Sequence, residues 1–214
     1  PSTSPDLLAF AREAGRQSVR IAQMENMKPT DIVTMDSFEN AILVHAAISG
    51  STNAMLHLPA IAHEFGIEIT GETFDRLHRN ARYLLDVRPA GRWPAECFYY
   101  AGGVPAIMEE IKEHLHLDVM TVTGKTLGEN LEELKQNGFY EKCNKWLQEF
   151  NKRYNVNLTK EDIIRPYDKA IGIDGSIALL KGNLAPDGSV VKRSAVVDEM
   201  LVHEGPARVF DCED

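Results

Sequence analysis

Four short blocks rich in glycine and small polar residues could carry chemistry. They are Ser49–Asn53, Ala101–Ala106, Thr121–Asn130 and Leu180–Lys192. In the first block, hydroxyl and amide side chains stand ahead of a predicted helix, and the N–H groups at a helix start can bind a carboxylate or phosphate. The same residue types also cap helices and form turns. We take Ser51, Thr52 and Asn53 as candidate substrate-binding residues, with a capping or turn role as the competing interpretation.

Two other blocks imitate ligand-binding loops. Gly102-Gly103 would let a backbone approach a ligand closely, but it would equally suit a tight turn packed against a neighbour, and we favour packing. Gly124-Lys125-Thr126 resembles the end of a phosphate-binding loop. That motif needs a glycine five residues before Gly124, and Val119 stands there. A nucleotide-binding loop is therefore excluded, and Thr126 is predicted to cap a helix.

The histidines and cysteines show no metal-binding spacing. His63-Glu64 lacks a second histidine four residues after the first, and His114 and His116 have no evident third ligand nearby. A metal site needs several convergent ligands, so each residue is interpreted as an ordinary surface or core residue. We predict neither a metal ligand nor a catalytic residue in this chain. The full set is His45, His57, His63, His78, His114, His116, His203, Cys97, Cys143 and Cys212.

In their order and spacing, the four blocks closely resemble the middle of the ilvD/Edd dehydratases, the family of dihydroxy-acid, sugar-acid and 6-phosphogluconate dehydratases. The resemblance covers nearly all 214 residues. It implies a hydro-lyase that removes water from a 2,3-dihydroxy acid or sugar acid to give a 2-keto acid. It also implies an iron–sulfur cluster and Mg²⁺. One departure is Cys97, which lies where the family more commonly has Glu-Asp before an aromatic pair, so no acidic role is transferred to it.

The resemblance further implies an internal segment of a longer enzyme. The family's cluster cysteines lie in blocks such as Cys-Asp-Lys-x-x-Pro-Gly, and its Mg²⁺ carboxylates and proposed serine base also lie in blocks outside this chain. We expect the segment to be inactive alone, and the intact enzyme to be a dimer or tetramer that acts on a small-molecule hydroxy acid. The competing interpretation is a non-catalytic helical interaction module. A hydrolase built on Ser51 is weaker, because the Gly-x-Ser-x-Gly elbow is missing.

Composition excludes several classes of partner. The formal net charge of −9 argues against a nucleic-acid partner, since phosphate backbones require a basic surface. The longest apolar run, near Ala41–Ile48, is far too short to cross a bilayer. Three widely spaced cysteines argue against a disulfide scaffold and favour a reducing compartment. We therefore expect a cytoplasmic protein that binds neither nucleic acid nor membrane.

The N-terminal part has helical periodicity. Ser4 is predicted to cap a first helix, with Pro5 at its first position, Asp6 in its first turn and an apolar face of Leu7, Leu8, Ala11, Ala14, Ile21 and Ala22. This helix should end near Asn26. A second helix is predicted from a capping box at Asp36 to Ile48, and a third over Ala54–Phe65, ended by Gly66.

The middle of the chain alternates between short strand patterns and helix patterns. Strands are predicted at Ile67–Thr70, Leu84–Val87 and Asp118–Val122. Helices are predicted at Thr73–Asn80, Val104–His116, after Thr126, and at Glu141–Tyr154 with Trp146, Leu147 and Phe150 facing inward.

Beyond Arg165-Pro166 the periodicity changes to that of strands. Ser176–Lys181 and Ser189–Arg193 should pair across a turn at Pro186–Gly188, and Ala207–Phe210 should form a third strand. The predicted fold class is α+β, with a helix-rich part at residues 1–165 and the start of a mainly β, barrel-like domain at residues 166–214.

Overall fold

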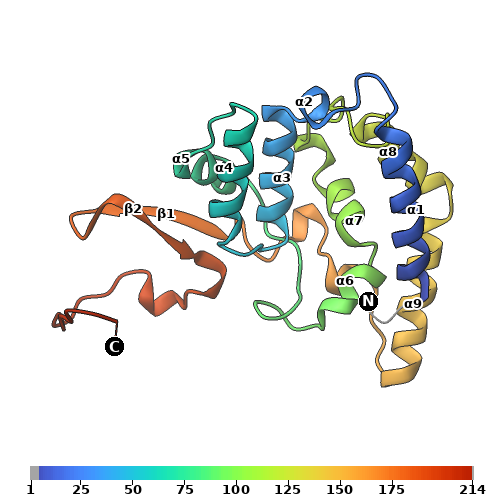
Figure 1. The fold of residues 1–214 in the computed structure, drawn as a ribbon. Helices are drawn as coiled ribbons and strands as arrows, with labels where there is room; N and C mark the ends of the chain where they lie inside the picture. Colours follow the sequence, from blue (N-terminus) through green and yellow to red (C-terminus); the bar gives the residue numbers. More distant parts are fainter. Residues whose placement is uncertain (1–4, 214) are drawn as a thin grey trace.

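The computed structural model describes residues 5–213, in which helices form the body and one hairpin projects from it (Figure 1). This arrangement confirms the α+β class. The helices are α1 (Pro5–Ile21), α2 (Pro29–Ile32), α3 (Met35–Ala47), α4 (Ala54–Glu64), α5 (Gly71–Arg79), α6 (Ala95–Tyr100), α7 (Gly103–Glu110), α8 (Leu127–Gln136), α9 (Phe139–Tyr154) and α10 (Lys160–Ile163). The strands β1 (Ile177–Gly182) and β2 (Ala185–Lys192) are antiparallel. Turns of 3₁₀ helix occur at Lys112–His114, Tyr167–Lys169, Arg193–Ala195 and Asp198–Met200.

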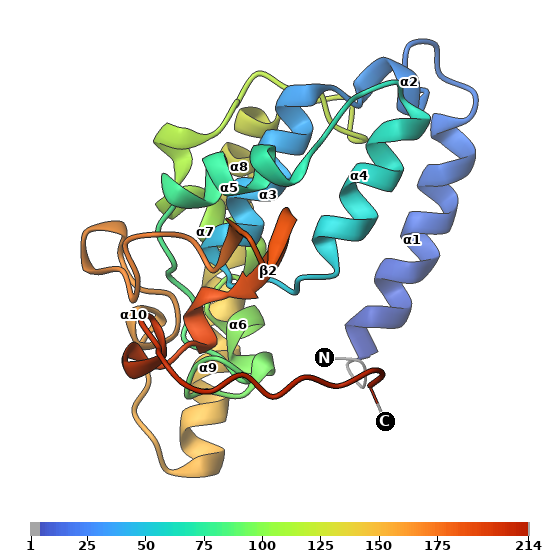
Figure 2. The same ribbon diagram turned by 90° about the vertical axis from the view of Figure 1, so that its left-hand side faces the viewer.

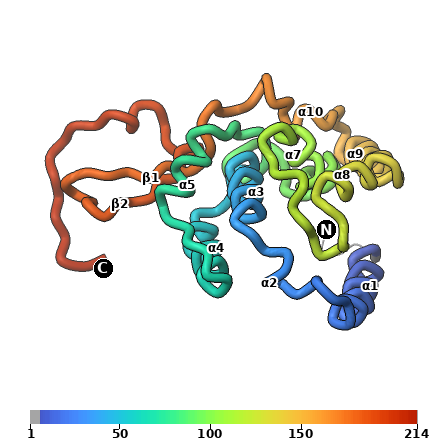
Figure 3. Tube along the Cα trace, turned by 90° about the horizontal axis from the view of Figure 1, so that it is seen from above, coloured from blue at the N-terminus to red at the C-terminus, as the bar shows by residue number. Residues whose placement is uncertain are grey.

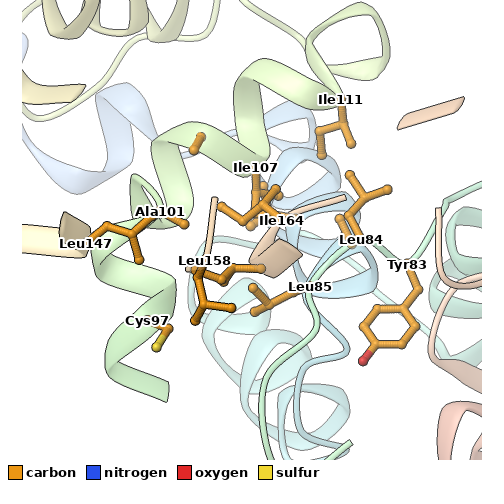
Figure 4. Close-up of a cluster of buried hydrophobic side chains, with 14 of the residues drawn as sticks. Tyr83, Leu84, Leu85, Cys97, Ala101, Ile107, Ile111, Leu147, Leu158 and Ile164 are labelled. Carbon is orange, nitrogen blue, oxygen red and sulfur yellow. The ribbon is translucent and has the colours of Figure 1, made fainter. Parts of the chain in front are cut away.

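Helix α3 lies between two clusters of buried apolar side chains. The larger cluster joins α3 to α6, α7 and α9 and is shown in Figure 4. At its centre Ile107, Ile163 and Ile164 are 0% exposed. Burying one such side chain stabilises a fold by about 1.5–3 kcal/mol. The smaller cluster joins α3 to α4 and α5 through Phe38, Ile42, Ala62, Ile69, Phe74 and Leu77. Packing on two sides fixes α3, and with it the loop that follows.

Several predicted strands are not strands of a sheet. Residues 67–70 are irregular, and Thr70 instead caps α5. Residues 84–87 are extended but make only isolated bridges, such as that of Leu85 with Ile164. Around Met120 there is again one isolated bridge, to Thr126. The physical reason is shared: an apolar extended segment becomes a strand only where another segment lies alongside to pair with it.

Some predicted helix ends also need correction. Helix α1 ends at Ile21 rather than near Asn26, which has a positive φ of 58°. The predicted cap Ser4 lies outside the described residues. Helix α3 is capped by Thr34, whose hydroxyl accepts the Ser37 N–H at 3.3 Å, so the capping box at Asp36 was misplaced. Helix α7 stops at Glu110 and is followed by a 3₁₀ turn. Helix α6 was not predicted.

Other helix predictions are confirmed. Helix α4 ends where Gly66 adopts a positive φ of 68°. Thr126 caps α8, with its hydroxyl accepting the Glu129 N–H at 3.2 Å and its own N–H donating to that carboxylate at 2.7 Å. In α9, Leu147 is buried while Trp146 and Phe150 are half-buried. Capping boxes succeed as signals because both partners lie within one turn of chain.

The hairpin turns at a different place from the one predicted. Gly182 pairs with Ala185, so the turn is Asn183-Leu184, and Pro186–Gly188 lies inside β2. The pairing is irregular between Leu180 and Gly182, and the facing Gly188 has a positive φ of 102°. Glycine tolerates such a bulge, which is why the Pro-Asp-Gly pattern looked like the turn. Residues 207–210, predicted as a third strand, are irregular and exposed.

Helix α1 lies at one edge of the molecule, apart from the two apolar clusters (Figure 3). Lys142 on α9 joins it through an ion pair with Asp6 at 2.9 Å and through its contact with the Phe10 ring, 5.9 Å from the ring centroid. The apolar residues predicted to face inward are largely exposed, among them Leu7 and Leu8. No helix in residues 5–213 combines the length and apolar character that crossing a membrane requires.

We predict that Gly102→Ala destabilises the protein by about 3 kcal/mol. Gly102 has a φ of 105°, and an added Cβ would lie 2.7 Å from Ala106 Cβ and 3.1 Å from the Tyr140 ring. Backbone strain and overpacking each cost of order 1–3 kcal/mol. Gly124→Ala is the matched control, since its φ is 75° but nothing lies within 4 Å. It should cost about 1 kcal/mol. Urea unfolding measures both, and equal losses would refute the packing role.

Candidate functional site

The loop Ser49–Asn53 connects α3 to α4 and lies against the end of the hairpin (Figure 2). Ser49 is buried with a positive φ of 54°, and its hydroxyl lies 2.8 Å from the Ser194 hydroxyl. The Lys192 ammonium donates to the Ser49 carbonyl at 3.0 Å. These contacts span more than 140 residues of chain and tie the start of the loop to the end of β2 and to the 3₁₀ turn that follows it.

The three predicted binding residues, Ser51, Thr52 and Asn53, are all exposed at the start of α4. Asn53 occupies the N-cap position in an αR conformation, and its side chain makes no capping hydrogen bond. The Ser51 hydroxyl accepts the Asn53 N–H at 3.3 Å. The capping interpretation therefore does not describe Asn53, while Ser51 does help to form the turn.

Lys192 and Ser194 were not predicted as part of this region. Lys192 closes the last of the four sequence blocks, and its contact with Ser49 joins that block to the first. A lysine inside a strand pattern gives no signal of such a contact. The ammonium nevertheless supplies positive charge beside the loop of a protein whose formal net charge is −9. Local charge of this kind can favour an anionic ligand.

Two buried histidines lie directly beneath the loop. His45 on α3 is 8% exposed and His78 on α5 is 1% exposed. His45 Nδ1 lies 3.3 Å from His78 Nε2, and His45 Nε2 lies 2.8 Å from the Ser51 carbonyl. The Ile177 N–H, at the start of β1, donates to His78 Nδ1 at 3.2 Å. Both are core residues, as one of the two ordinary interpretations held, but their pairing was not foreseen.

Burial favours the neutral form of both rings. It lowers the pKa of His78 to about 4, with a further decrease from His45 and a partial increase from the Asp75 carboxylate. Burial also lowers the pKa of His45. The hydrogen bond to the Ser51 carbonyl raises this pKa in part, and the positive charge of Lys192 lowers it further. Both imidazoles are therefore neutral at pH 7.

One group of side chains in the described residues could approach a cation together. Asp36, Glu39 and His116 place ligand atoms within 4.8 Å of one another, a grouping that the sequence analysis did not predict for His116. Glu39, however, already pairs with Arg76 at 2.7 Å and with His116 at 3.1 Å. The guanidinium lowers the pKa of Glu39. Glu39 and His116 are thus engaged in a surface ion-pair network with Arg76, and the exposed Asp36 lies beside it.

The cysteines do not fit an iron–sulfur cluster. Cys97 is 0% exposed in the apolar core, where burial raises the pKa of its thiol to about 11. Burial likewise raises the pKa of the Cys143 thiol, and Cys212 is exposed near the end of the tail. Cluster ligands are thiolates that converge on the metal, and buried neutral thiols are poor ligands. Cys97 is a buried core residue, a position that does not require the acidic side chain more common in the family.

Two family models match the chain. The model described as dihydroxy-acid/6-phosphogluconate dehydratase N-terminal matches residues 1–130, and the corresponding C-terminal model matches residues 162–214. Dihydroxy-acid dehydratase of Methanosarcina barkeri is 48% identical over 205 residues, which is 96% of this chain and 34% of that protein. The Acetivibrio thermocellus protein of the same name is 43% identical over 216 residues, which is 100% of this chain and 35% of that protein. The chain thus spans about a third of the length of these curated relatives.

We expect Gly50→Ala to disturb the loop severely. An added Cβ would lie 2.1 Å from Cδ2 of the His45 ring, which is buried and cannot move away. Overpacking of this kind costs about 1–3 kcal/mol. Gly182→Ala is the control, because nothing lies within 4 Å of its added Cβ, and it should stay within about 0.5 kcal/mol of wild type. Thermal unfolding of the two variants decides, and a Gly50→Ala protein as stable as wild type would contradict this geometry.

The stability of the folded chain should fall as pH decreases from about 6.5 to about 4. The lowered pKa of His78 means that the unfolded state binds more protons in this window, so its contribution is complete above pH 6.5 and lost toward pH 4. A shift of this size corresponds to about 3 kcal/mol. Urea unfolding measured between pH 5 and 7 stays above the range in which most carboxylates titrate. His78→Gln should flatten the pH dependence, whereas the exposed tail control His203→Gln should not. An unchanged slope in His78→Gln would reject the assignment.

Proposed function

The chain belongs to the dihydroxy-acid/6-phosphogluconate dehydratase family, and on this basis we propose that it is an internal segment of a hydro-lyase that dehydrates 2,3-dihydroxy acids to 2-keto acids. The N-terminal family model, which matches residues 1–130, is the observation that carries this proposal. Relatives at up to 48% identity are named dihydroxy-acid dehydratase. Sugar acids remain within the proposed substrate class.

This dehydration requires a base to take the proton at carbon 2, help for the departing 3-hydroxyl, and positive charge for the developing enolate. The described residues offer no convergent set of thiolates, and in the group of Asp36, Glu39 and His116 the Glu39 carboxylate is already paired with Arg76. We therefore assign no catalytic step to this chain. In our proposal the iron–sulfur cluster and Mg²⁺ of the family would be held by other parts of the intact enzyme, and this segment would be inactive alone.

We assign substrate binding to Ser51, Thr52 and Asn53. Their hydroxyls and amide can donate hydrogen bonds to carboxylate and hydroxyl oxygens of the acid. Their exposure leaves these groups available, and the ammonium of Lys192 beside Ser49 favours an anion. The backbone of the loop is held from below by His45, so the side chains would be presented in one arrangement.

The organisation of the intact protein follows as further proposals. We keep residues 1–165 as a helix-rich part and 166–214 as the beginning of a β domain. The exposed apolar face of α1 would be covered by other parts of the enzyme or by another subunit of a dimer or tetramer. The free cysteines suit a cytoplasmic location. The non-catalytic interaction module has no comparable support.

Substitutions in the loop should weaken substrate binding in the full-length enzyme. We predict that Asn53→Ala lowers kcat/KM for a 2,3-dihydroxy acid by 10- to 100-fold, or about 1.4–2.7 kcal/mol of transition-state stabilisation. Asn144→Ala is the matched control, an exposed asparagine on α9. Production of the 2-keto acid by the reconstituted enzyme is the measurement. Equal activity in the two variants would remove Asn53 from the site.

The segment alone should not catalyse the reaction. We expect no 2-keto acid above background when these 214 residues are purified, supplied with iron, sulfide and Mg²⁺, and offered a panel of aldonic and dihydroxy acids. The full-length enzyme treated identically is the positive control. Turnover by the segment would show that catalytic groups do lie within it.

A further inference from the structure

The histidine pair is a group of two buried titratable side chains that the proposed function leaves unused. His45 and His78 lie 33 residues apart, on α3 and α5, and the start of β1 reaches the pair through His78. A polar group is buried without cost only when its hydrogen bonds are satisfied. All four ring nitrogens of the pair have a partner, which makes the pair a complete hydrogen-bond chain rather than an accidental contact.

The groups at the two ends of this hydrogen-bond chain determine the direction in which its hydrogen bonds point. A backbone N–H can only donate, so the Ile177 N–H makes His78 Nδ1 an acceptor and leaves the proton on Nε2. His78 Nε2–H then donates to His45 Nδ1, which must be unprotonated. His45 Nε2–H in turn donates to the Ser51 carbonyl, which can only accept. Both rings are thus neutral Nε2–H tautomers, since every ring nitrogen of the hydrogen-bond chain is already engaged and an added proton would find no acceptor among them.

The surroundings hold both rings in this state. An added Cβ at Gly50 would lie 2.1 Å from the His45 ring, and one at Gly175 would lie 2.6 Å from His78 Nδ1. The Phe74 ring stands nearly perpendicular to the His45 ring, with ring centroids 6.4 Å apart. The charged groups that act on the pair are Asp75 on α5, which is engaged by Arg79 and by the Leu179 N–H, and Lys192 on β2. Neither offers a site for an extra imidazole proton.

We propose that His45 and His78 are positioning residues, which act as a neutral, one-way hydrogen-bond relay from the backbone of β1 to the Ser51 carbonyl and so fix the Ser51–Asn53 loop. The inference rests on the proposed function in one respect, namely that this loop binds the acid. The relay itself does not depend on that assignment. It makes the position of the binding loop a consequence of how the hairpin docks on α5.

The first test concerns the relay alone. In the 214-residue chain labelled with ¹⁵N-histidine, long-range ¹H–¹⁵N spectra report the tautomer of each ring. The expected result is Nε2–H for both His45 and His78 throughout pH 5–8, assigned with the single variants His45→Gln and His78→Gln. A Nδ1–H tautomer, or titration of either ring near pH 6.5, overturns the relay. If the isolated chain does not fold, the same spectra are recorded on the full-length enzyme with segmental labelling.

The second test concerns positioning, in the full-length enzyme. His45→Leu removes the bond to Ser51 and should raise KM at least tenfold, with kcat changed less. His45→Gln, whose amide can reach the Ser51 carbonyl, should restore KM to within about threefold of wild type. A purely structural role would instead make both variants alike in KM and different only in melting temperature. Correct tautomers with an unchanged KM in His45→Leu would overturn positioning.

The two proposals fail separately. If Ser51→Ala, Thr52→Val and Asn53→Ala all leave KM unchanged, substrate binding by the loop is wrong, whatever the histidine tautomers. If those variants raise KM and His45→Leu does not, the loop binds substrate but the relay does not position it, and the further inference is rejected.

Discussion

Two buried imidazoles share one hydrogen bond at the junction of α3, α5 and the hairpin, and their outer nitrogens are bonded to backbone groups on either side. An unpaired polar group there would cost about 1–3 kcal/mol. The loop, the two helices and β1 must therefore keep their relative positions for the pair to remain satisfied.

Sterics reinforce the same constraint. The histidine pair fits only because the residues packed against it, Gly50 beside His45 and Gly175 beside His78, have no side chain. The Gly175 N–H also donates to the His78 carbonyl at 2.6 Å, which brings the start of the hairpin onto the end of α5. Close backbone approach is available only where no Cβ intervenes. The glycine in Ser49–Asn53 is therefore explained by the ring beneath it, without reference to a ligand.

Local signals predicted local structure, and the errors lie where distant segments decide. The helix cap at Thr126 and the end of α4 at Gly66 depend on neighbours within a few residues, and both are correct. The predicted strands failed because the sequence gives composition but not a pairing partner. The hairpin turn failed because Pro186–Gly188 suits a bulge as well as a turn. Nothing in the sequence could reveal that His45 meets His78, since each is a single histidine on its own helix.

The candidate site combines properties that usually conflict. A binding loop needs a fixed backbone, which requires hydrogen bonds, yet it also needs side chains that are not already engaged. Here the backbone carbonyls of Ser49 and Ser51 take the contacts from Lys192 and His45. The hydroxyl of Thr52 and the amide of Asn53 are left exposed. In the proposed site, rigidity would come from buried groups below the loop and recognition from groups above it, so we expect a substitution below the loop to alter binding without touching the ligand.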